Sequence, residues 1–149
     1  MHNRSSKQKS KTVYTNFLGF LVKNGNKLAA KKTIDTAFIE TSRQAKLPLH
    51  LILIKVFSRI NSFVETKKIK IKRSTHTVPF GITSKRRSYL VIKWLMEVVA
   101  EDKSKVSTSK KLSTELLNIL KDKSSKTVKK KDLNINQAIS NRSNIHYRW

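Results

Sequence analysis

The chain reads TKKIKIKRSTHTVPF from Thr66 to Phe80, unlike the sequence on either side. In the first seven residues, cations alternate with isoleucine at a period of two, which is the period of a β-strand. Residues 75–80 are rich in β-formers and predict a second strand, with Pro79 at an edge or an end because it lacks an N–H. We therefore predict a β-hairpin at about residues 66–80 that turns near residues 72–74. One face is too cationic to be buried, so the hairpin should project from the body.

Three amphipathic helices are predicted before the hairpin. The first is capped by Thr15 or Asn16 and ended by Gly25, the second spans Lys27 to Gln44, and the third starts at Pro48 and runs to about Ser62. Their inner faces are predicted to carry Phe17, Leu18, Leu21, Val22, Leu28, Ala30, Ile34, Ala37, Phe38, Thr41, Leu49, Ile52, Leu53, Val56, Phe57 and Ile60.

Helical spacing resumes after the hairpin. Thr83 or Ser84 should cap a fourth helix, and Ser107 or Thr108 a fifth. Lys123 to Lys131 is interpreted as a basic loop, and a more polar helix should follow from Asp132. The fourth helix carries an apolar stripe of Leu90, Val91, Trp94, Leu95 and Val98. The predicted fold is mainly α, a bundle of five to six short helices with one protruding β-hairpin between helices three and four, and Trp94 is predicted to lie in its core.

The length of 149 residues suits one domain. We expect a basic N-terminal tail at residues 1–13 and a single helical domain at residues 14–149. The tail holds Lys7, Lys9 and Lys11 and lacks an apolar face, which favours nucleic-acid binding. A cleaved organellar presequence is the alternative.

The charge of the chain restricts its partners. Lys and Arg total 33 against 9 Asp and Glu, a formal net charge of +24. Such a chain repels itself, and a polyanion, either nucleic acid or an anionic membrane surface, relieves this repulsion. No apolar run approaches the ~18 residues that a membrane span needs. The absence of cysteine excludes disulfides and thiolate metal sites.

The residue pattern does not predict a catalytic site. The four histidines, at positions 2, 50, 76 and 146, lie in four different segments without an acid or nucleophile at helical spacing. Three glycines are too few for a phosphate-binding loop, and metal-ligand spacing is missing. We expect no enzyme activity, no cofactor and no metal.

Cations at high density instead favour phosphate contact. Nine Lys or Arg and no acid lie between Glu65 and Glu97, although any single Lys could equally belong to a solvated face. Tyr147 and Trp149 have no apolar pattern to join, so RNA stacking is the expected role for both. The predicted RNA-binding residues are Lys7, Lys9, Lys11, Lys67, Lys68, Lys70, Lys72, Arg73, Lys85, Arg86, Arg87, Lys129, Lys130, Lys131, His146, Tyr147, Arg148 and Trp149.

Five short motifs in order resemble one family, ribosomal protein seven of the small subunit, over about residues 14–149. The ending HYRW at residues 146–149 is similar to the family's C-terminus, and VKKK at residues 128–131 is similar to its VKKR. The other three motifs are Val78-Pro79 with Arg86-Arg87 and Trp94, Val64-Glu65 at the start of the hairpin, and Asn24-Gly25-Asn26-Lys27 between the first two helices.

The resemblance implies a structural protein that binds the 3′ domain of the small-subunit rRNA and organises the head. It implies a hairpin that lines the tRNA exit site and the mRNA path, and small-subunit proteins nine and eleven as neighbours. In the family two glycines usually turn the hairpin, whereas Lys72 and Arg73 stand here. We therefore expect no tight turn with a positive φ at these positions.

Two other classes of protein also carry a large positive charge. A DNA-compacting protein would also combine helices with basic β-arms, but it would dimerise through a broad apolar face, and no homo-oligomer is expected here. A peripheral membrane protein would concentrate its cations on one amphipathic helix. Lys outnumbers Arg by 25 to 8, which suggests an AT-rich genome. The favoured compartment is the mitochondrion (ribosome, matrix), with a plastid or a bacterial cytoplasm as alternatives.

Overall fold

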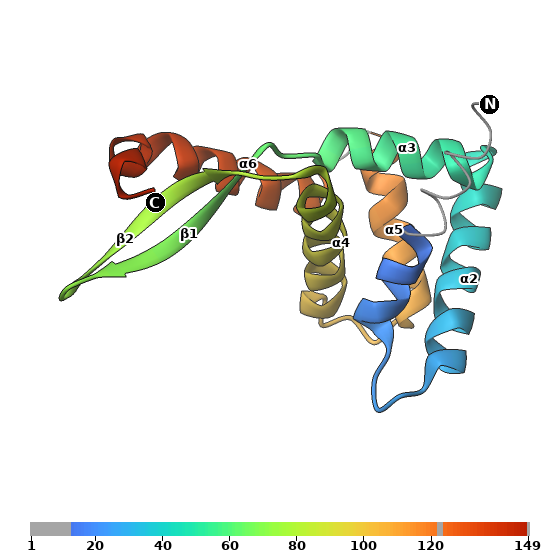
Figure 1. The fold of residues 1–149 in the computed structure, drawn as a ribbon. Helices are drawn as coiled ribbons and strands as arrows, with labels where there is room; N and C mark the ends of the chain where they lie inside the picture. The colour runs from blue at the N-terminus through green and yellow to red at the C-terminus, as the bar shows by residue number, and fades with distance from the viewer. Residues whose placement is uncertain (1–12, 122–123, 149) are drawn as a thin grey trace, which may run out of the picture.

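The computed structural model describes residues 13–121 and 124–148. A first helix covers residues 13–21. The chain continues through α2 (Lys27–Ala45), α3 (Leu49–Ile60), β1 (Val64–Ile71), β2 (Ser74–Gly81), α4 (Ser84–Glu101), α5 (Thr108–Leu120), α6 (Lys126–Ser140) and a 3-10 helix, η1 (Arg142–Tyr147). The mainly α fold, with one hairpin between the third and fourth helices, is confirmed (Figure 1).

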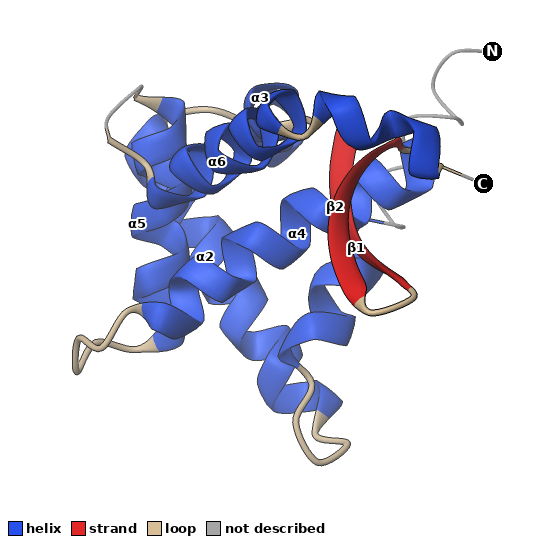
Figure 2. Ribbon diagram, turned by 90° about the vertical axis from the view of Figure 1, so that its left-hand side faces the viewer, coloured by secondary structure: helices blue, strands red, loops and turns tan. Residues whose placement is uncertain are grey.

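The helices form a body from which the hairpin projects. In Figure 1, α3 lies across the ends of α2, α4 and α5, while α6 extends away from them toward the hairpin. α6 packs against β1, and η1 packs against β2. Figure 2 shows the two strands at one side of the molecule, with the turn between them pointing outward. The hairpin is therefore held along part of its length by the C-terminal elements.

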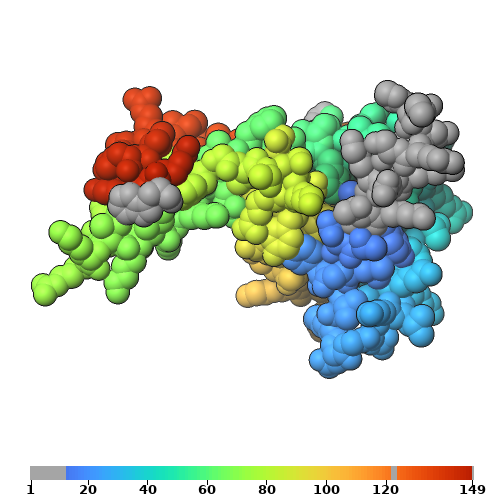
Figure 3. Space-filling model, viewed as in Figure 1, coloured from blue at the N-terminus to red at the C-terminus, as the bar shows by residue number. Residues whose placement is uncertain are grey.

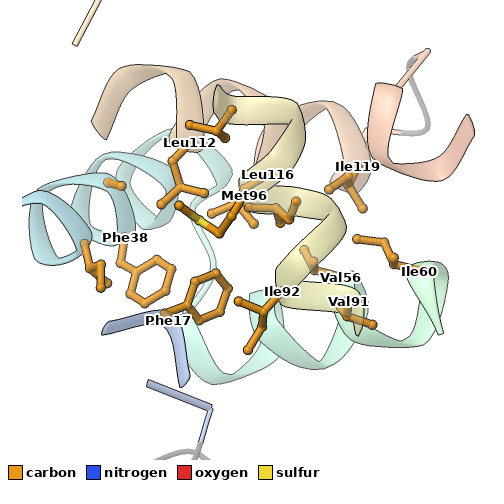
Figure 4. Close-up of a cluster of buried hydrophobic side chains, with 14 of the residues drawn as sticks. Phe17, Phe38, Val56, Ile60, Val91, Ile92, Met96, Leu112, Leu116 and Ile119 are labelled. Atoms are coloured by element: carbon orange, nitrogen blue, oxygen red, sulfur yellow. The ribbon is translucent and has the colours of Figure 1, made fainter. Parts of the chain in front are cut away.

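The core lies between the first helix and helices α2 to α5 (Figure 4). Phe17 and Phe38 meet edge to face, with ring centroids 5.6 Å apart and an interplanar angle of 88°. Ile52 of α3, Leu95 of α4 and Leu116 of α5 are fully buried around them. Since each such side chain contributes about 1.5–3 kcal/mol on burial, this cluster is the main source of stability.

Two predictions about the first helices were wrong. The first helix starts before Thr15 and Asn16, because Val13 and Tyr14 also pack against the core. The hydroxyl of Tyr14 donates to Oδ1 of Asp35 at 2.8 Å, and burial together with this bond raises the pKa of Tyr14 to about 12. Leu28 is 81% exposed, because it lies two positions before the buried Ala30 and so on another side of α2.

Smaller differences concern helix ends and Trp94. The first helix ends at residue 21, and Gly25, with a φ of +76°, lies in the turn that follows. α3 ends at Ile60, two residues before the predicted end.

Trp94 packs against the core but stays partly exposed. Ile92, Met96 and Val99 of the same helix face inward, and Trp94 therefore lies at the margin of the core. Trp94 is thus a margin residue of the core.

The basic loop predicted for Lys123 to Lys131 is largely helix, since α6 starts at Lys126. The reason is a buried carboxylate on α5. Glu115 accepts hydrogen bonds from the Ser125 hydroxyl at 2.7 Å, from the Thr127 hydroxyl at 2.7 Å and from the Thr127 N–H at 3.0 Å. The Ser125 oxygen also accepts from the N–H of Val128. These bonds satisfy donors that a helix N-terminus leaves open, so α6 can begin among lysines.

The hairpin turn contradicts the expectation drawn from the missing glycines. Val64 pairs with Gly81 and Ile71 with Ser74, which leaves a two-residue turn of Lys72 and Arg73. Lys72 has a φ of +53°. A two-residue turn that follows the right-handed twist of its strands needs a positive φ at its first position. Lysine therefore adopts the left-handed conformation here at a cost of about 1–2 kcal/mol.

Candidate nucleic-acid interface

The hairpin presents its cations to solvent. Lys67, Lys68, Lys70, Lys72 and Arg73 are all exposed. Alternation puts Lys68 and Lys70 on one face and the half-buried Ile69 and Ile71 on the other, as predicted. The Nζ of Lys67 lies 5.4 Å from the ring centroid of Phe80, a cation–π contact that keeps this cation near the base of the hairpin. Figure 3 shows the hairpin extending outward from the body.

The start of α4 combines an ion pair with an exposed lysine. Arg86 donates to both oxygens of Glu65 on β1, with Nη2–Oε1 at 2.6 Å and Nε–Oε2 at 2.9 Å. This hydrogen bond lowers the pKa of Glu65 and raises that of Arg86. Lys85 is exposed. Of these two adjacent cations, Arg86 thus already has a protein partner, while Lys85 faces solvent.

Arg87 lies over an aromatic ring. Its guanidinium carbon is 4.4 Å from the ring centroid of Phe63, which is 66% exposed. Its Nε is buried and makes no hydrogen bond within the described ranges 13–121 and 124–148. A guanidinium stacked in this way can still donate from its outer nitrogens to phosphate.

The three lysines on α6 differ from one another. Lys129 is exposed. The Nζ of Lys130 pairs with Glu101 at 2.6 Å and Glu97 at 3.4 Å. Burial opposes the charge of Lys130, but its bonds to these carboxylates prevail and raise its pKa. Lys131 donates to the carbonyl of Arg59 at 3.0 Å. Lys130 and Lys131 thus tie α6 to α4 and α3.

The C-terminal residues fold back onto β2. Arg148 donates to the carbonyl of Pro79, with its Nε at 3.1 Å. The ring of Tyr147 lies 4.6 Å from that of His76 and 3.9 Å from that of His146, centroid to centroid. Protein partners for Tyr147 and Arg148 were not predicted, since nothing in the spacing of the sequence indicates that the C-terminus meets the hairpin.

Comparison with known proteins identifies the family of the chain. Residues 1–142 match the family of ribosomal protein S7p/S5e. The chain belongs to this family. It is 29% identical over 137 residues to the small ribosomal subunit protein uS7 of Wigglesworthia glossinidia brevipalpis, covering 92% of this chain and 86% of that protein. It is 30% identical over 137 residues to the protein uS7m of Reclinomonas americana, covering 92% and 85%.

A third relative, the protein uS7 of Nitrosococcus oceani, is 31% identical over 133 residues, covering 89% of this chain and 84% of that protein. Membership in the S7p/S5e family makes the chain a structural, non-enzymatic ribosomal protein. In the part of the chain that the structure describes, no three His, Cys, Asp or Glu side chains gather as metal ligands. No helix among these residues has the length and apolarity to cross a bilayer.

The structure brings two groups of predicted residues together in this S7p/S5e chain. Lys67, Arg86 and Arg87 each contact a residue at the base of the hairpin, namely Phe80, Glu65 and Phe63. Tyr147 and Arg148 contact β2, and His146 contacts Tyr147. Lys129 to Lys131 lie apart on the first turns of α6. Lys7, Lys9, Lys11 and Trp149 fall outside the described residues. The predicted RNA-binding residues do not include Glu65; the signal for Glu65 was its place as the single acid of the hairpin.

Proposed function

We propose that this protein, as a structural component of the small ribosomal subunit, binds the 3′ domain of the small-subunit rRNA and organises the head. In this proposal its hairpin lines the tRNA exit site and the mRNA path. Family membership supports the ribosomal role, and the distribution of paired and unpaired cations supports the RNA contacts.

One observation carries the proposal. Within residues 13–121 and 124–148, the ion pairs join Arg86, Lys93 and Lys130 to carboxylates, and none involves a cation of the outer hairpin. The outer cations are Lys68, Lys70, Lys72 and Arg73, and all are exposed. Unpaired cations on a projecting element are suited to neutralise phosphates and release counterions.

The body supplies the remaining proposed contacts. Lys85 and the outer nitrogens of Arg86 and Arg87 lie at the start of α4, whose first N–H groups also favour anions. The proposed RNA-binding residues outside the hairpin are Lys7, Lys9, Lys11, Lys85, Arg86, Arg87, Lys129, Lys130, Lys131, His146, Tyr147, Arg148 and Trp149. Lys130 and Lys131 would contact RNA while remaining bonded to the protein.

Proteins nine and eleven of the small subunit are the proposed protein neighbours. Exposed apolar side chains on α2 and α3, among them Leu28, Ile39 and Ile54, offer surface for protein contacts. The proposed compartment is a mitochondrial ribosome in the matrix, which the likeness to the uS7m protein supports. The alternatives are a bacterial cytoplasm, with which the bacterial relatives agree, and a plastid.

The test measures binding of the full chain to a fragment of the rRNA head over a range of salt concentrations. We expect a steep log–log slope, to which each phosphate contact adds about −0.7 for single strands and −0.9 for duplex. Replacing Lys68, Lys70 and Lys72 by alanine should make the slope less steep by about 2–3. The matched control replaces Lys27, Lys31 and Lys32 of α2, which are equally exposed. A nearly flat slope for the parent, or equal effects of the two triple variants, contradicts the proposal.

A further inference from the structure

A small hollow lies between the end of α3 and the start of α4, near the point where the hairpin leaves the body (Figure 1). Phe57 and Asn61 line it from the side of α3, and Ser84, Arg87 and Val91 line it from α4. We call this space the α3–α4 hollow. Its volume is about 220 Å³, which is below the ~300 Å³ at which sites for drug-sized ligands begin. The hollow therefore suits a group as small as one nucleobase or one side chain.

The lining combines apolar surface with uncharged polar groups. Val91 is buried and Phe57 is half-buried, so the inner part of the hollow is apolar. Ser58 and Ser88 also line it, and each donates its hydroxyl to a carbonyl of its own helix, at 2.8 and 3.2 Å. Since the two protons are used in this way, the hydroxyl oxygens offer their lone pairs to a ligand.

Asn61 and Ser84 carry polar groups without a protein partner. Within residues 13–121 and 124–148, the amide of Asn61 and the hydroxyl of Ser84 make no hydrogen bond. Asn61 is half-buried, so its amide is partly removed from water without a replacement bond. An amide holds a donor and an acceptor side by side, and this pattern matches the edge of a nucleobase.

Arg87 supplies a flat group at the hollow. Its guanidinium carbon lies 4.4 Å from the ring centroid of Phe63, and Phe63 is 66% exposed. Because Arg87 also lines the hollow, one side of its guanidinium lies on the ring and the group remains available to a ligand in the hollow. Proteins hold unpaired RNA bases by stacking them on guanidinium planes or aromatic rings and by bonding to their edges.

The charge of the lining favours a base over a phosphate. Arg87 is the single charged residue among the described residues that line the hollow, although the chain has a formal net charge of +24. Phosphates are held mainly by lysine and arginine, whereas bases need apolar surface and groups that both donate and accept. Lys85 follows Ser84 and is exposed, so a phosphate of the same strand can pair with a cation outside the hollow.

We propose that the α3–α4 hollow binds one unpaired RNA base, stacked on the guanidinium of Arg87 and hydrogen-bonded at its edge by Asn61. The inference rests on the proposed function for the kind of partner, and it adds a site that distinguishes one base from another. Phe63 is a positioning residue in this site, because it holds the guanidinium plane and does not itself line the hollow.

The experiment uses the full chain and fluorescent RNA hexamers that all have the same number of phosphates. One hexamer is fully abasic, and each of the others carries a single adenine, guanine, cytosine or uracil at its third position. By fluorescence anisotropy, the parent should bind at least one single-base hexamer about 5- to 100-fold more tightly than the abasic hexamer. Phe63→Leu should reduce this gain for every base. Asn61→Ala should make the affinities for the single-base hexamers more nearly equal, because it removes the contact to the edge.

Both variants should bind the abasic hexamer as the parent does, with the same salt slope, because neither removes a cation. Asn118→Ala on α5 is the matched control. Asn118 is also half-buried and its side chain makes no hydrogen bond to the residues that the structure describes, but it lies outside the hollow. Its replacement should change none of the affinities.

Equal affinity of the parent for all hexamers would overturn the proposal and leave the hollow to a side chain of a protein neighbour. Variants that weaken the abasic hexamer as much as the others would make the hollow a phosphate site, and variants without any effect would contradict a base site. If one variant changes the circular dichroism spectrum, the other decides. A parent that selects a base but does not bind the rRNA head fragment contradicts the proposed function and leaves the base site intact.

Discussion

Glu65 on β1 and Arg86 on α4 form a two-point ion pair that joins the base of the hairpin to the helical body, with contacts of 2.6 and 2.9 Å. The side chain of Glu65 is 13% exposed and that of Arg86 is 42% exposed. The side chain of Glu65 is therefore mostly buried, while that of Arg86 stays partly in water. Two-point bonding restricts the angle between the two groups, so the pair helps to orient the base of the hairpin, together with α6 and η1, which pack against the strands.

The change Glu65→Gln should lower the free energy of unfolding by about 1 kcal/mol at neutral pH, a small value because Arg86 is partly in water. The pKa of Glu65 is lowered in the folded chain by its hydrogen bond to Arg86. The stabilisation is therefore fully present above the unfolded value of about 4.3 and is lost as the pH falls through the lower folded value. Urea unfolding of parent and variant at pH 7, and at several values below pH 4, measures this loss.

The control for this prediction is Glu40→Gln on α2. The carboxylate of Glu40 accepts a hydrogen bond from Gln44 one turn away and lies in an exposed position. Its replacement should change stability by less than about 0.5 kcal/mol at either pH. If Glu65→Gln destabilises the chain equally at pH 7 and at the lowest pH, charge pairing is not the cause.

Glu115 should be the acid on which the fold depends most. It is 8% exposed and accepts three hydrogen bonds from Ser125 and Thr127. Glu115→Ala leaves these buried donors without an acceptor, and we expect a loss of about 2–4 kcal/mol. Glu115→Gln keeps one acceptor oxygen and should cost less. Urea unfolding measures both variants, with Glu40→Ala as the exposed control; similar losses for Glu115→Ala and Glu40→Ala would contradict the assigned role.

The helices and the hairpin could be predicted because each shows its period locally. Alternation from Thr66 to Lys72 and helical spacing in α2 to α5 depend on neighbours within a few residues. The start of α6 could not be predicted in this way, since its cap is completed by Glu115, ten residues before Ser125. The lysine run at the start of α6 suggested solvent, but the fold brings Glu97 and Glu101 of α4 next to Lys130.

The cations of the site could be listed from the sequence, but their partners could not. Composition and charge runs indicate which residues are available to phosphate. They do not distinguish Arg86, which is bonded to Glu65, from Lys85, which is exposed. The contact between His76 and Tyr147 joins residues 71 positions apart in the sequence, and only the packing of η1 on β2 brings them together.

The hairpin turn offers a stabilising substitution. Lys72 has a φ of +53°, a conformation that costs a residue with a Cβ about 1–2 kcal/mol and glycine almost nothing. Part of this gain is lost because glycine is more flexible in the unfolded chain. Lys72→Gly should therefore stabilise the hairpin by about 0.5–1 kcal/mol, which slower hydrogen exchange of the strand amides would reveal.

Arg73→Gly is the matched control for the turn, because it removes one cation from the same turn at a position without a positive φ. It should leave exchange unchanged or make it faster. Slower exchange in both glycine variants would point to relief of charge repulsion, and would contradict the backbone argument for Lys72.

Trp94→Ala separates a packing role from a direct role in RNA binding. Trp94 packs against the buried cluster from α4 while part of its surface remains in water. Full truncation of a buried tryptophan costs about 3–5 kcal/mol, and the exposed part reduces this to about 2–3 kcal/mol here. Urea unfolding measures the loss, and Ile54→Ala, at a 62% exposed position of α3, should cost less than about 0.5 kcal/mol.

At a temperature where both variants are folded, their affinity for the rRNA head fragment should equal that of the parent. A Trp94→Ala variant that melts with the parent but binds RNA less tightly would make Trp94 a stacking residue.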